Sequence, residues 1–239
     1  MSRILKFSLV IFTFFLLSFS PAPDRKVTIW MIGDSTMALK KKERNPESGW
    51  GVEFKLFVNE NVIVNNRAAS GRSSKSFVVE KRWKAVLDSI QPGDYVIIQF
   101  GHNDEKKDSL LHTDAKTTYK QFLKKFIDET RSKAANPIIC SSIVRRHFDG
   151  NGKLLDTHGD YIRASREIAS ETNTSFIDIE AFSRQLVSKL GSERSKTLYT
   201  MRKGVLDSTH LNHEGARQIA ALFVNSVKKQ KLSLATFFK

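Results

Sequence analysis

Five short apolar runs rich in β-branched residues recur along the chain, and they largely lack a strict alternation of apolar and polar positions. They cover residues 27–32, 62–64, 95–100, 138–144 and 175–179. Continuous apolar runs of this length are typical of strands that are buried on both faces of a parallel sheet. The pattern therefore predicts five buried strands.

Helical periodicity fills stretches between these runs. Apolar residues recur at spacings of three and four over 119–127, and Asp114 is the predicted start signal of that helix. A second apolar stripe covers 216–227 and is followed by lysines, which the C-terminal end of the helix dipole favours. Strands that alternate with helices predict an α/β fold, a three-layer α/β/α sandwich around a five-stranded parallel sheet. The Gly- and Asp-rich segment 148–158 is predicted to be a surface loop.

The N-terminus has a different pattern. A basic start precedes an apolar run over 7–19, and the helix-breaking sequence Ser-Pro-Ala-Pro follows at 20–23. This layout is typical of a secretory signal peptide, because the apolar run is shorter than the roughly 20 residues that span a bilayer. We expect residues 1–22 to be a signal peptide and 23–239 to be one domain, periplasmic or secreted, with no stable membrane association after cleavage. A retained N-terminal anchor is the alternative.

Composition narrows the class of partner. The 239 residues are 40% hydrophobic and 27% charged, which is ordinary for a soluble globular protein. The net charge is +14, and loss of the signal peptide, which carries two positive charges and no acid, leaves +12. Such a charge favours polyanionic partners. Because no nucleic-acid-binding motif accompanies it, we expect an acidic polysaccharide rather than nucleic acid. The alternative is a merely basic surface, on which Lys40, Lys41, Lys42 and Arg44 would be a solvated loop. The oligomeric state is not predicted.

Two other kinds of chemistry are disfavoured. Cys140 is the single cysteine, so no internal disulfide forms, and its apolar surroundings favour a buried, inert thiol over a nucleophile. His213 follows His210 by three residues, but no further ligands stand at spacings that suit a metal. We therefore expect neither a metal nor another cofactor.

Unusual polar sequences follow the first three predicted strands. They are Gly-Asp-Ser-Thr-Met at 33–37, Asn-Arg-Ala-Ala-Ser-Gly-Arg-Ser-Ser at 66–74, and Gly-His-Asn-Asp at 101–104. In an open parallel sheet, ligands bind outside the carboxyl ends of the strands. The three sequences are therefore expected to lie on one edge of the sheet and to form a pocket there.

Ser35 is the candidate nucleophile of this pocket. A serine hydroxyl needs a base to take its proton, and the base needs an orienting group. Asp207 and His210, three residues apart in a predicted loop before the last helix, supply both. The structural alternatives are that Ser35 caps a helix near its N-terminus, that Asp207 caps the last helix, and that His210 is a surface residue.

Acyl transfer also requires hydrogen-bond donors aimed at the developing oxyanion. Gly71 allows its backbone N–H to approach closely, Asn103 offers a side-chain amide, and the N–H of Ser35 completes the set. A turn glycine and a helix-capping asparagine are the alternatives. We interpret Ser35, Gly71 and Asn103 as a candidate oxyanion hole because all three are expected at the same edge of the sheet as the candidate nucleophile and base.

The four blocks at Ser35, Gly71, Asn103 and Asp207 to His210, in this order, resemble the signature blocks of the SGNH (GDSL-type) hydrolases. The resemblance implies a flavodoxin-like SGNH hydrolase fold for 23–239, with Ser35 as nucleophile, His210 as general base and Asp207 as its orienting acid. Within the superfamily, the residues of these blocks are most similar to those of rhamnogalacturonan acetylesterases. The chain lacks the disulfides that some secreted members carry. The Gly-x-Ser-x-Gly elbow of the α/β-hydrolases is also absent.

The resemblance implies a serine esterase that removes acetyl groups from a plant cell-wall polysaccharide, acetylated pectin first of all, through an acetyl-serine intermediate. A lipase or lysophospholipase of the same superfamily, a xylan acetylesterase and a catalytically silent carbohydrate-binding protein are the alternatives. Arg72, Arg145 and Arg146 are candidates for holding uronate carboxylates, with plain surface charge as the competing interpretation.

Overall fold

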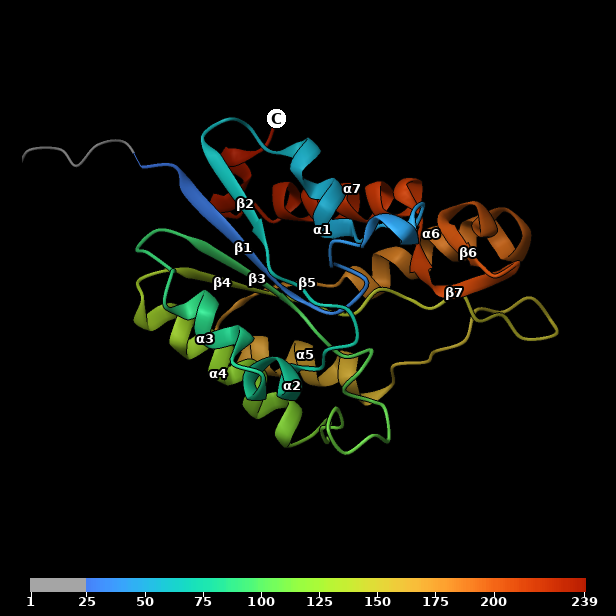
Figure 1. The fold of residues 1–239 in the computed structure, drawn as a ribbon, viewed down its shortest axis with the longest axis horizontal. Coiled ribbons are helices and arrows are strands. Elements are labelled where there is room, and N and C mark those ends of the chain that lie inside the picture. The colour runs from blue at the N-terminus through green and yellow to red at the C-terminus, as the bar shows by residue number, and fades with distance from the viewer. Residues whose placement is uncertain (1–24) are drawn as a thin grey trace, which may run out of the picture.

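The computed structural model describes residues 25–239, and the predicted signal peptide at 1–22 lies outside this described part. Five strands form one parallel sheet in the order β2-β1-β3-β4-β5, at the centre of Figure 1. The strands are β1 (Val27–Gly33), β2 (Val62–Asn66), β3 (Tyr95–Gln99), β4 (Asn136–Cys140) and β5 (Ser175–Ile177). The prediction of an α/β fold with a five-stranded parallel sheet is confirmed.

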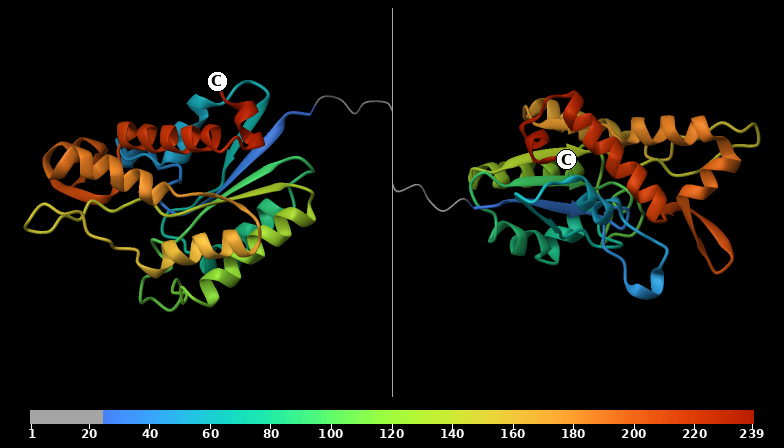
Figure 2. Two further views of the ribbon diagram at one scale, coloured as in Figure 1. Left: turned by 180° about the vertical axis from the view of Figure 1, so that it is seen from behind. Right: turned by 90° about the horizontal axis from the view of Figure 1, so that it is seen from above.

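Two layers of helices cover the two faces of the sheet (Figures 1 and 2). One face carries α1 (Trp50–Glu53), α6 (Ile179–Arg194) and α7 (His213–Lys229). The other carries α2 (Ser74–Val79), α3 (Arg82–Leu87), α4 (Thr118–Ser132) and α5 (Asp160–Glu171). Short 3-10 helices are η1 (Lys42–Arg44), η2 (Phe54–Phe57), η3 (Ser195–Leu198) and η4 (Ser233–Phe237).

Each face of the sheet packs on its own hydrophobic core. Along β1, Ile29 and Met31 belong to the core under α7, whereas Trp30 and Ile32 belong to the core under α4. All four are buried, as the non-alternating apolar run predicted. Cys140 is buried in the α7 core, and this burial raises the pKa of its thiol well above the usual range. The thiol is therefore inert toward thiolate chemistry near neutral pH.

Strand β4 ends earlier than the sequence pattern predicted, at Cys140 rather than at residue 144. The Ser141 N–H still donates to the Ile177 carbonyl of β5 at 3.2 Å, but other groups of the next residues bond to the start of α6. The Ser141 hydroxyl accepts the N–H of Glu180 at 2.9 Å, and the N–H of Val144 donates to the Ser183 hydroxyl at 2.9 Å. The apolar run alone does not show where the strand ends, because the residues of α6 that bond to this segment lie about 40 residues further along the chain.

The start of α4 also differs from the prediction. The Asp114 carboxylate accepts the N–H groups of Lys116 and Thr117, both at 2.9 Å, and so closes a separate turn. The helix itself begins four residues later, at Thr118. Aspartate favours such local turns as readily as helix caps, so the sequence signal fits both.

A two-stranded antiparallel hairpin, β6 (Tyr199–Arg202) and β7 (Val205–Leu211), precedes α7. Asp207 and His210, predicted to lie in a loop, lie in β7. The right-hand view of Figure 2 shows this hairpin and the loop around η1 projecting from the same side of the molecule. These two projections form walls of the pocket described below.

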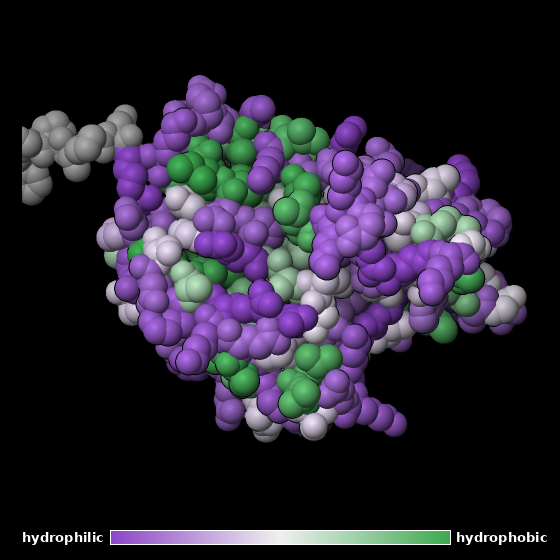
Figure 3. Space-filling model, viewed as in Figure 1, coloured by the Kyte–Doolittle hydropathy of each residue, from purple (hydrophilic) through white to green (hydrophobic). Residues whose placement is uncertain are grey.

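The face seen in Figure 3 is mainly hydrophilic, with hydrophobic side chains gathered over β2 and the neighbouring α1 and η2. Leu56 and Ile63, each about half exposed, are among the exposed large hydrophobic residues in these elements. Within residues 25–239, no helix combines the length and the apolar character that crossing a membrane requires.

Candidate active site

The candidate site lies where the sheet order changes direction. Strands β1 and β3 are neighbours, but the chain leaves β1 toward β2 on one side and leaves β3 toward β4 on the other. Such a switch point opens a crevice at the carboxyl ends of the strands. Ser35 follows β1 and Asn103 follows β3, so the fold places both at this crevice.

The Asp34 carboxylate shapes the turn that presents Ser35. Its Oδ1 atom accepts the N–H and the hydroxyl of Thr36, both at 2.8 Å, and its backbone carbonyl accepts the N–H of Ala38 at 3.1 Å. The residues after Ser35 form a turn, and the next helical segment, the 3-10 helix η1, begins only at Lys42. Ser35 is therefore not a helix cap, which removes one structural alternative.

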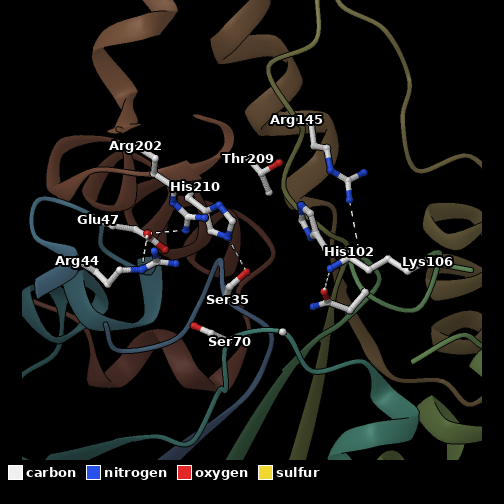
Figure 4. Close-up of a pocket in the computed structure, with 12 residues that line it drawn as sticks. Ser35, Arg44, Glu47, Ser70, His102, Lys106, Arg145, Arg202, Thr209 and His210 are labelled. Atoms are coloured by element: carbon white, nitrogen blue, oxygen red, sulfur yellow. Dashed lines mark hydrogen bonds and ion pairs between the residues drawn. The ribbon is translucent and has the colours of Figure 1, made fainter. Parts of the chain in front are cut away.

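Three distant side chains meet at this turn. The Ser35 Oγ lies 3.0 Å from His210 Nε2 (Figure 4). On the other side of the ring, His210 Nδ1 lies 2.9 Å from Asp207 Oδ2. The other carboxylate oxygen of Asp207 accepts the backbone N–H groups of Thr209 at 2.7 Å and His210 at 2.8 Å. The carboxylate thus fixes both the imidazole ring and the backbone that carries it, leaving Nε2 free to accept the serine proton.

The Asp207 carboxyl is ionised in this arrangement. Its partial burial acts to raise the pKa, but the hydrogen bond from the His210 side chain and those from two backbone N–H groups outweigh burial and hold the pKa well below its usual range. An ionised Asp207 stabilises the imidazolium that forms when His210 takes a proton. Asp207 does not cap α7, because that cap is Asn212, whose side chain accepts the N–H of Gly215 at 2.9 Å.

The predicted oxyanion-hole residues line the same cavity as Ser35 and His210. Gly71 has a φ of +78°, a conformation that a side chain would strain, and space is open where its Cβ would be. Asn103 is buried, and its Nδ2 donates to the Arg72 carbonyl at 3.0 Å. The cavity has a volume of about 380 Å³ and is lined by Ser35, Arg44, Glu47, Ser70, Gly71, His102, Asn103, Lys106, Arg145, Arg202, Thr209 and His210.

One wall of the cavity is an ion-pair cluster that the sequence did not reveal. The Glu47 carboxylate is 2% exposed and faces Arg202 at 2.6 Å, Lys40 at 2.8 Å and Arg44 at 3.6 Å. Arg202 Nε also lies 3.1 Å from Asp207 Oδ2. Glu47 therefore joins the loop around η1 to the hairpin that carries Asp207 and His210. Lys40 belongs to this cluster and is only 6% exposed, so it is not part of a solvated loop as the alternative interpretation held.

The opposite wall carries Arg145, which forms an ion pair with Glu105 and donates to the His102 carbonyl at 3.3 Å. Two arginines that the sequence suggested for substrate binding do not line the cavity. Arg72 pairs with Glu80 at 3.0 Å, and the Arg146 guanidinium donates to the Ser195 hydroxyl at 3.0 Å. Of the three arginines named from the sequence, only Arg145 faces the pocket.

Buried polar residues support the floor of the site. His102 lies 3.3 Å from Asp34, and burial, which outweighs the attraction of that carboxylate, lowers the imidazole pKa to about 4. The same pairing holds the pKa of Asp34 at about 2 in spite of its burial. His102 is therefore neutral at neutral pH. Asp104 accepts the N–H of Ser74 at 3.1 Å and so ties the end of β3 to the start of α2.

The second histidine of the C-terminal segment, His213, points elsewhere. Its ring contacts Glu53 at 2.8 Å and Asn45 at 3.1 Å. In the described part of the chain, no group of three or more His, Cys, Asp or Glu side chains is arranged to hold a metal ion.

Comparisons with known proteins match almost the whole described chain. The model of the GDSL-like lipase/acylhydrolase family matches residues 31–218. The rhamnogalacturonan acetylesterase RhgT of Bacillus subtilis (strain 168) is 35% identical over 219 residues, which cover 88% of this chain and 93% of RhgT.

Solved structures agree with the observed architecture. The crystal structure of the YXIM_BACsu protein from Bacillus subtilis has a TM-score of 0.76 at 27% identity and is matched over 87% of this chain, which spans 58% of that longer one. Axe2, an acetylxylan esterase from Geobacillus stearothermophilus, has a TM-score of 0.62 at 19% identity, over 84% of this chain and 94% of its own. Both similarities agree with the α/β architecture described above.

Proposed function

This chain belongs to the GDSL-like lipase/acylhydrolase family, and from that premise we propose that it is a serine esterase that removes O-acetyl groups from an acidic plant cell-wall polysaccharide, acetylated rhamnogalacturonan first of all. The resemblance stated from the sequence is confirmed by the family match and by RhgT. The observation that carries the proposal is the continuous contact from Asp207 through His210 to Ser35 at the rim of a polar cavity.

The proposed reaction has two steps. His210 Nε2 takes the Ser35 proton as Oγ attacks the acetyl carbonyl, and the resulting oxyanion is held by the N–H groups of Ser35 and Gly71 and by the Asn103 amide. The imidazolium then gives its proton to the departing sugar oxygen, which leaves an acetyl group on Ser35. Water, deprotonated by His210, releases acetate and restores the serine. No step requires a group beyond these residues and water.

The lining of the cavity favours a short acyl group on a polar substrate. Among the described residues that line it, none has an apolar side chain, whereas five are charged: Arg44, Glu47, Lys106, Arg145 and Arg202. A lipase needs apolar surface for its acyl chain. We therefore expect kcat/KM for 4-nitrophenyl octanoate to be more than about tenfold below that for the acetate ester. Equal or faster cleavage of the octanoate would favour the lipase alternative.

Acetate release from polysaccharides tests the substrate class. Acetylated rhamnogalacturonan, acetylated homogalacturonan and acetylated xylan are the panel, and we expect release from the first to be fastest. Faster release from xylan, whose main chain is neutral, would favour the xylan acetylesterase alternative. No release from any of them, with carbohydrate binding retained, would favour a catalytically silent carbohydrate-binding protein.

We further propose that the enzyme is exported, because residues 1–22 have the sequence pattern of a secretory signal peptide.

Arg44 is the cavity residue best suited to a substrate carboxylate. Three cations face the single carboxylate of Glu47, and Arg44 makes the longest of these contacts, at 3.6 Å. Its side chain is 49% exposed, so its remaining guanidinium donors face solvent at the rim. A guanidinium binds a carboxylate through two parallel hydrogen bonds when its donors are accessible. We propose that it binds a uronate near the acetylated sugar.

Replacing Arg44 with glutamine is expected to raise KM for acetylated rhamnogalacturonan oligosaccharides about tenfold, because one charge-assisted contact is lost. The KM for neutral 4-nitrophenyl acetate is expected to stay within about twofold. Steady-state kinetics at low and high salt measure both, and salt should shrink the difference. Arg217→Gln, at an exposed position on α7, is the matched control. An equal rise in KM for the neutral ester would contradict a carboxylate-binding role.

A further inference from the structure

The Asn103 side chain is held at both ends of its amide group. Its Nδ2 donates to the Arg72 carbonyl at 3.0 Å, and its Oδ1 accepts from the Lys106 ammonium at 2.6 Å. Asn103 itself is 3% exposed, whereas Lys106 is an exposed residue whose side chain lines the cavity. Figure 4 shows the Lys106 side chain on the same wall as Arg145, and Asn103 lines the same cavity.

These two partners specify the same orientation of the amide. An ammonium group only donates and a carbonyl only accepts, so Oδ1 must face Lys106 and Nδ2 must face Arg72. An amide Nδ2 has two hydrogens, and Arg72 uses one of them. The second remains for an oxyanion in the cavity. A flipped amide would instead present its oxygen to the negative charge that develops on the substrate.

The backbone of Lys106 is placed for this contact. Its N–H donates to the Asn103 carbonyl at 3.2 Å, and its own carbonyl contacts His112 Nδ1 at 2.9 Å. The ammonium group therefore returns onto the residue three positions earlier, across one short turn. In this position the cation contacts a neutral amide rather than a carboxylate, so its charge also polarises the N–H groups of that amide.

We propose that Lys106 is a positioning residue of the oxyanion hole: it fixes the Asn103 amide in the orientation that donates to the oxyanion, and it strengthens that donation. The inference rests on the proposed function, since it gives Asn103 a task only in acyl transfer. It requires that Lys106 act through Asn103 and not on the substrate directly.

A double-mutant cycle on 4-nitrophenyl acetate tests this dependence. Asn103→Ala is expected to lower kcat by about 10²- to 10³-fold, which is the effect of removing one oxyanion donor. Lys106→Met is expected to lower kcat about tenfold with little change in KM. The double variant is expected to match Asn103→Ala alone, because a residue that acts through the amide has no effect once the amide is gone.

Two further variants control the cycle. Lys106→Arg should recover most of the lost kcat, because a guanidinium also only donates, and Lys107→Met, at the next exposed residue, should match the wild type. Thermal unfolding of all variants checks that each is folded. If Lys106→Met does not fold, Lys106→Ala, which also removes the donor, replaces it, and full activity of that variant would overturn the inference.

Other outcomes are equally decisive. Multiplicative losses in the double variant would overturn the proposal, since Lys106 would then act independently of Asn103. A rise in KM confined to anionic substrates, with kcat unchanged, would also overturn it and make Lys106 a substrate-binding residue. A wild type without esterase activity would instead count against the proposed function, so the two failures are distinguishable.

Discussion

Replacing either Ser35 or His210 with alanine is expected to lower kcat for acetyl ester hydrolysis by about 10⁶-fold. The 3.0 Å contact between Ser35 Oγ and His210 Nε2 makes the two residues one functional unit, because the hydroxyl attacks only when the imidazole takes its proton. The double variant is therefore expected to be no slower than either single variant. Initial rates of acetate release at high enzyme concentration measure all three.

Ser208→Ala is the matched control for this experiment. Ser208 lies in the same strand, β7, but its hydroxyl contacts His147 at 2.7 Å rather than the site. The rate of acetate release by Ser208→Ala is expected to stay within about twofold of the wild-type rate. Retention of more than a few per cent of the activity in Ser35→Ala would contradict the account, as would losses that multiply in the double variant.

Asp207→Asn is expected to lower kcat by about 10⁴-fold while the fold is kept. The amide oxygen still accepts the N–H groups of Thr209 and His210, so the backbone of β7 stays in place. The amide nitrogen, however, donates to His210 Nδ1 and forces the proton of the ring onto Nε2. The imidazole then presents a hydrogen to Ser35 instead of a lone pair.

The pH profile and a control sharpen this prediction. Because hydrogen bonds hold the Asp207 pKa well below its usual range in the folded enzyme, its carboxylate is ionised throughout the neutral range, and the wild-type rate should show no loss from protonation of Asp207 there. Asp88→Asn, which removes an exposed ion pair with Lys84 on α3, should leave kcat unchanged. A loss of less than tenfold in Asp207→Asn would mean that this carboxylate does not set the tautomer of His210.

Much of the fold follows from local sequence. The largely apolar, non-alternating run at 95–100 predicted a strand that is buried on both faces. In the structure β3 is buried along its whole length. The polar blocks after β1 and β3 then had to meet at one edge, since parallel strands end on the same side. Ser35, Gly71 and Asn103, which follow β1, β2 and β3, line one cavity for this reason.

What local sequence could not supply depends on distant pairing. The segment 205–211 forms β7 because it pairs with β6, and its polar residues gave no strand pattern. Glu47 is buried only because Lys40 and Arg202 neutralise it from two different segments. From sequence alone, a run of charged residues predicts a solvated loop, because the oppositely charged residues that pair with it lie elsewhere in the chain. The one local signal for the buried ion-pair cluster was a glutamate close to the basic residues at 40–44.

The most direct test of the central claim is covalent labelling of Ser35 by a serine-directed phosphonate, followed by intact-mass and peptide mass spectrometry. We predict one adduct per chain, on Ser35, in the wild type, slow labelling of His210→Ala, and no adduct in Ser35→Ala. Equal labelling of wild type and Ser35→Ala, or an adduct on another serine, would contradict the account.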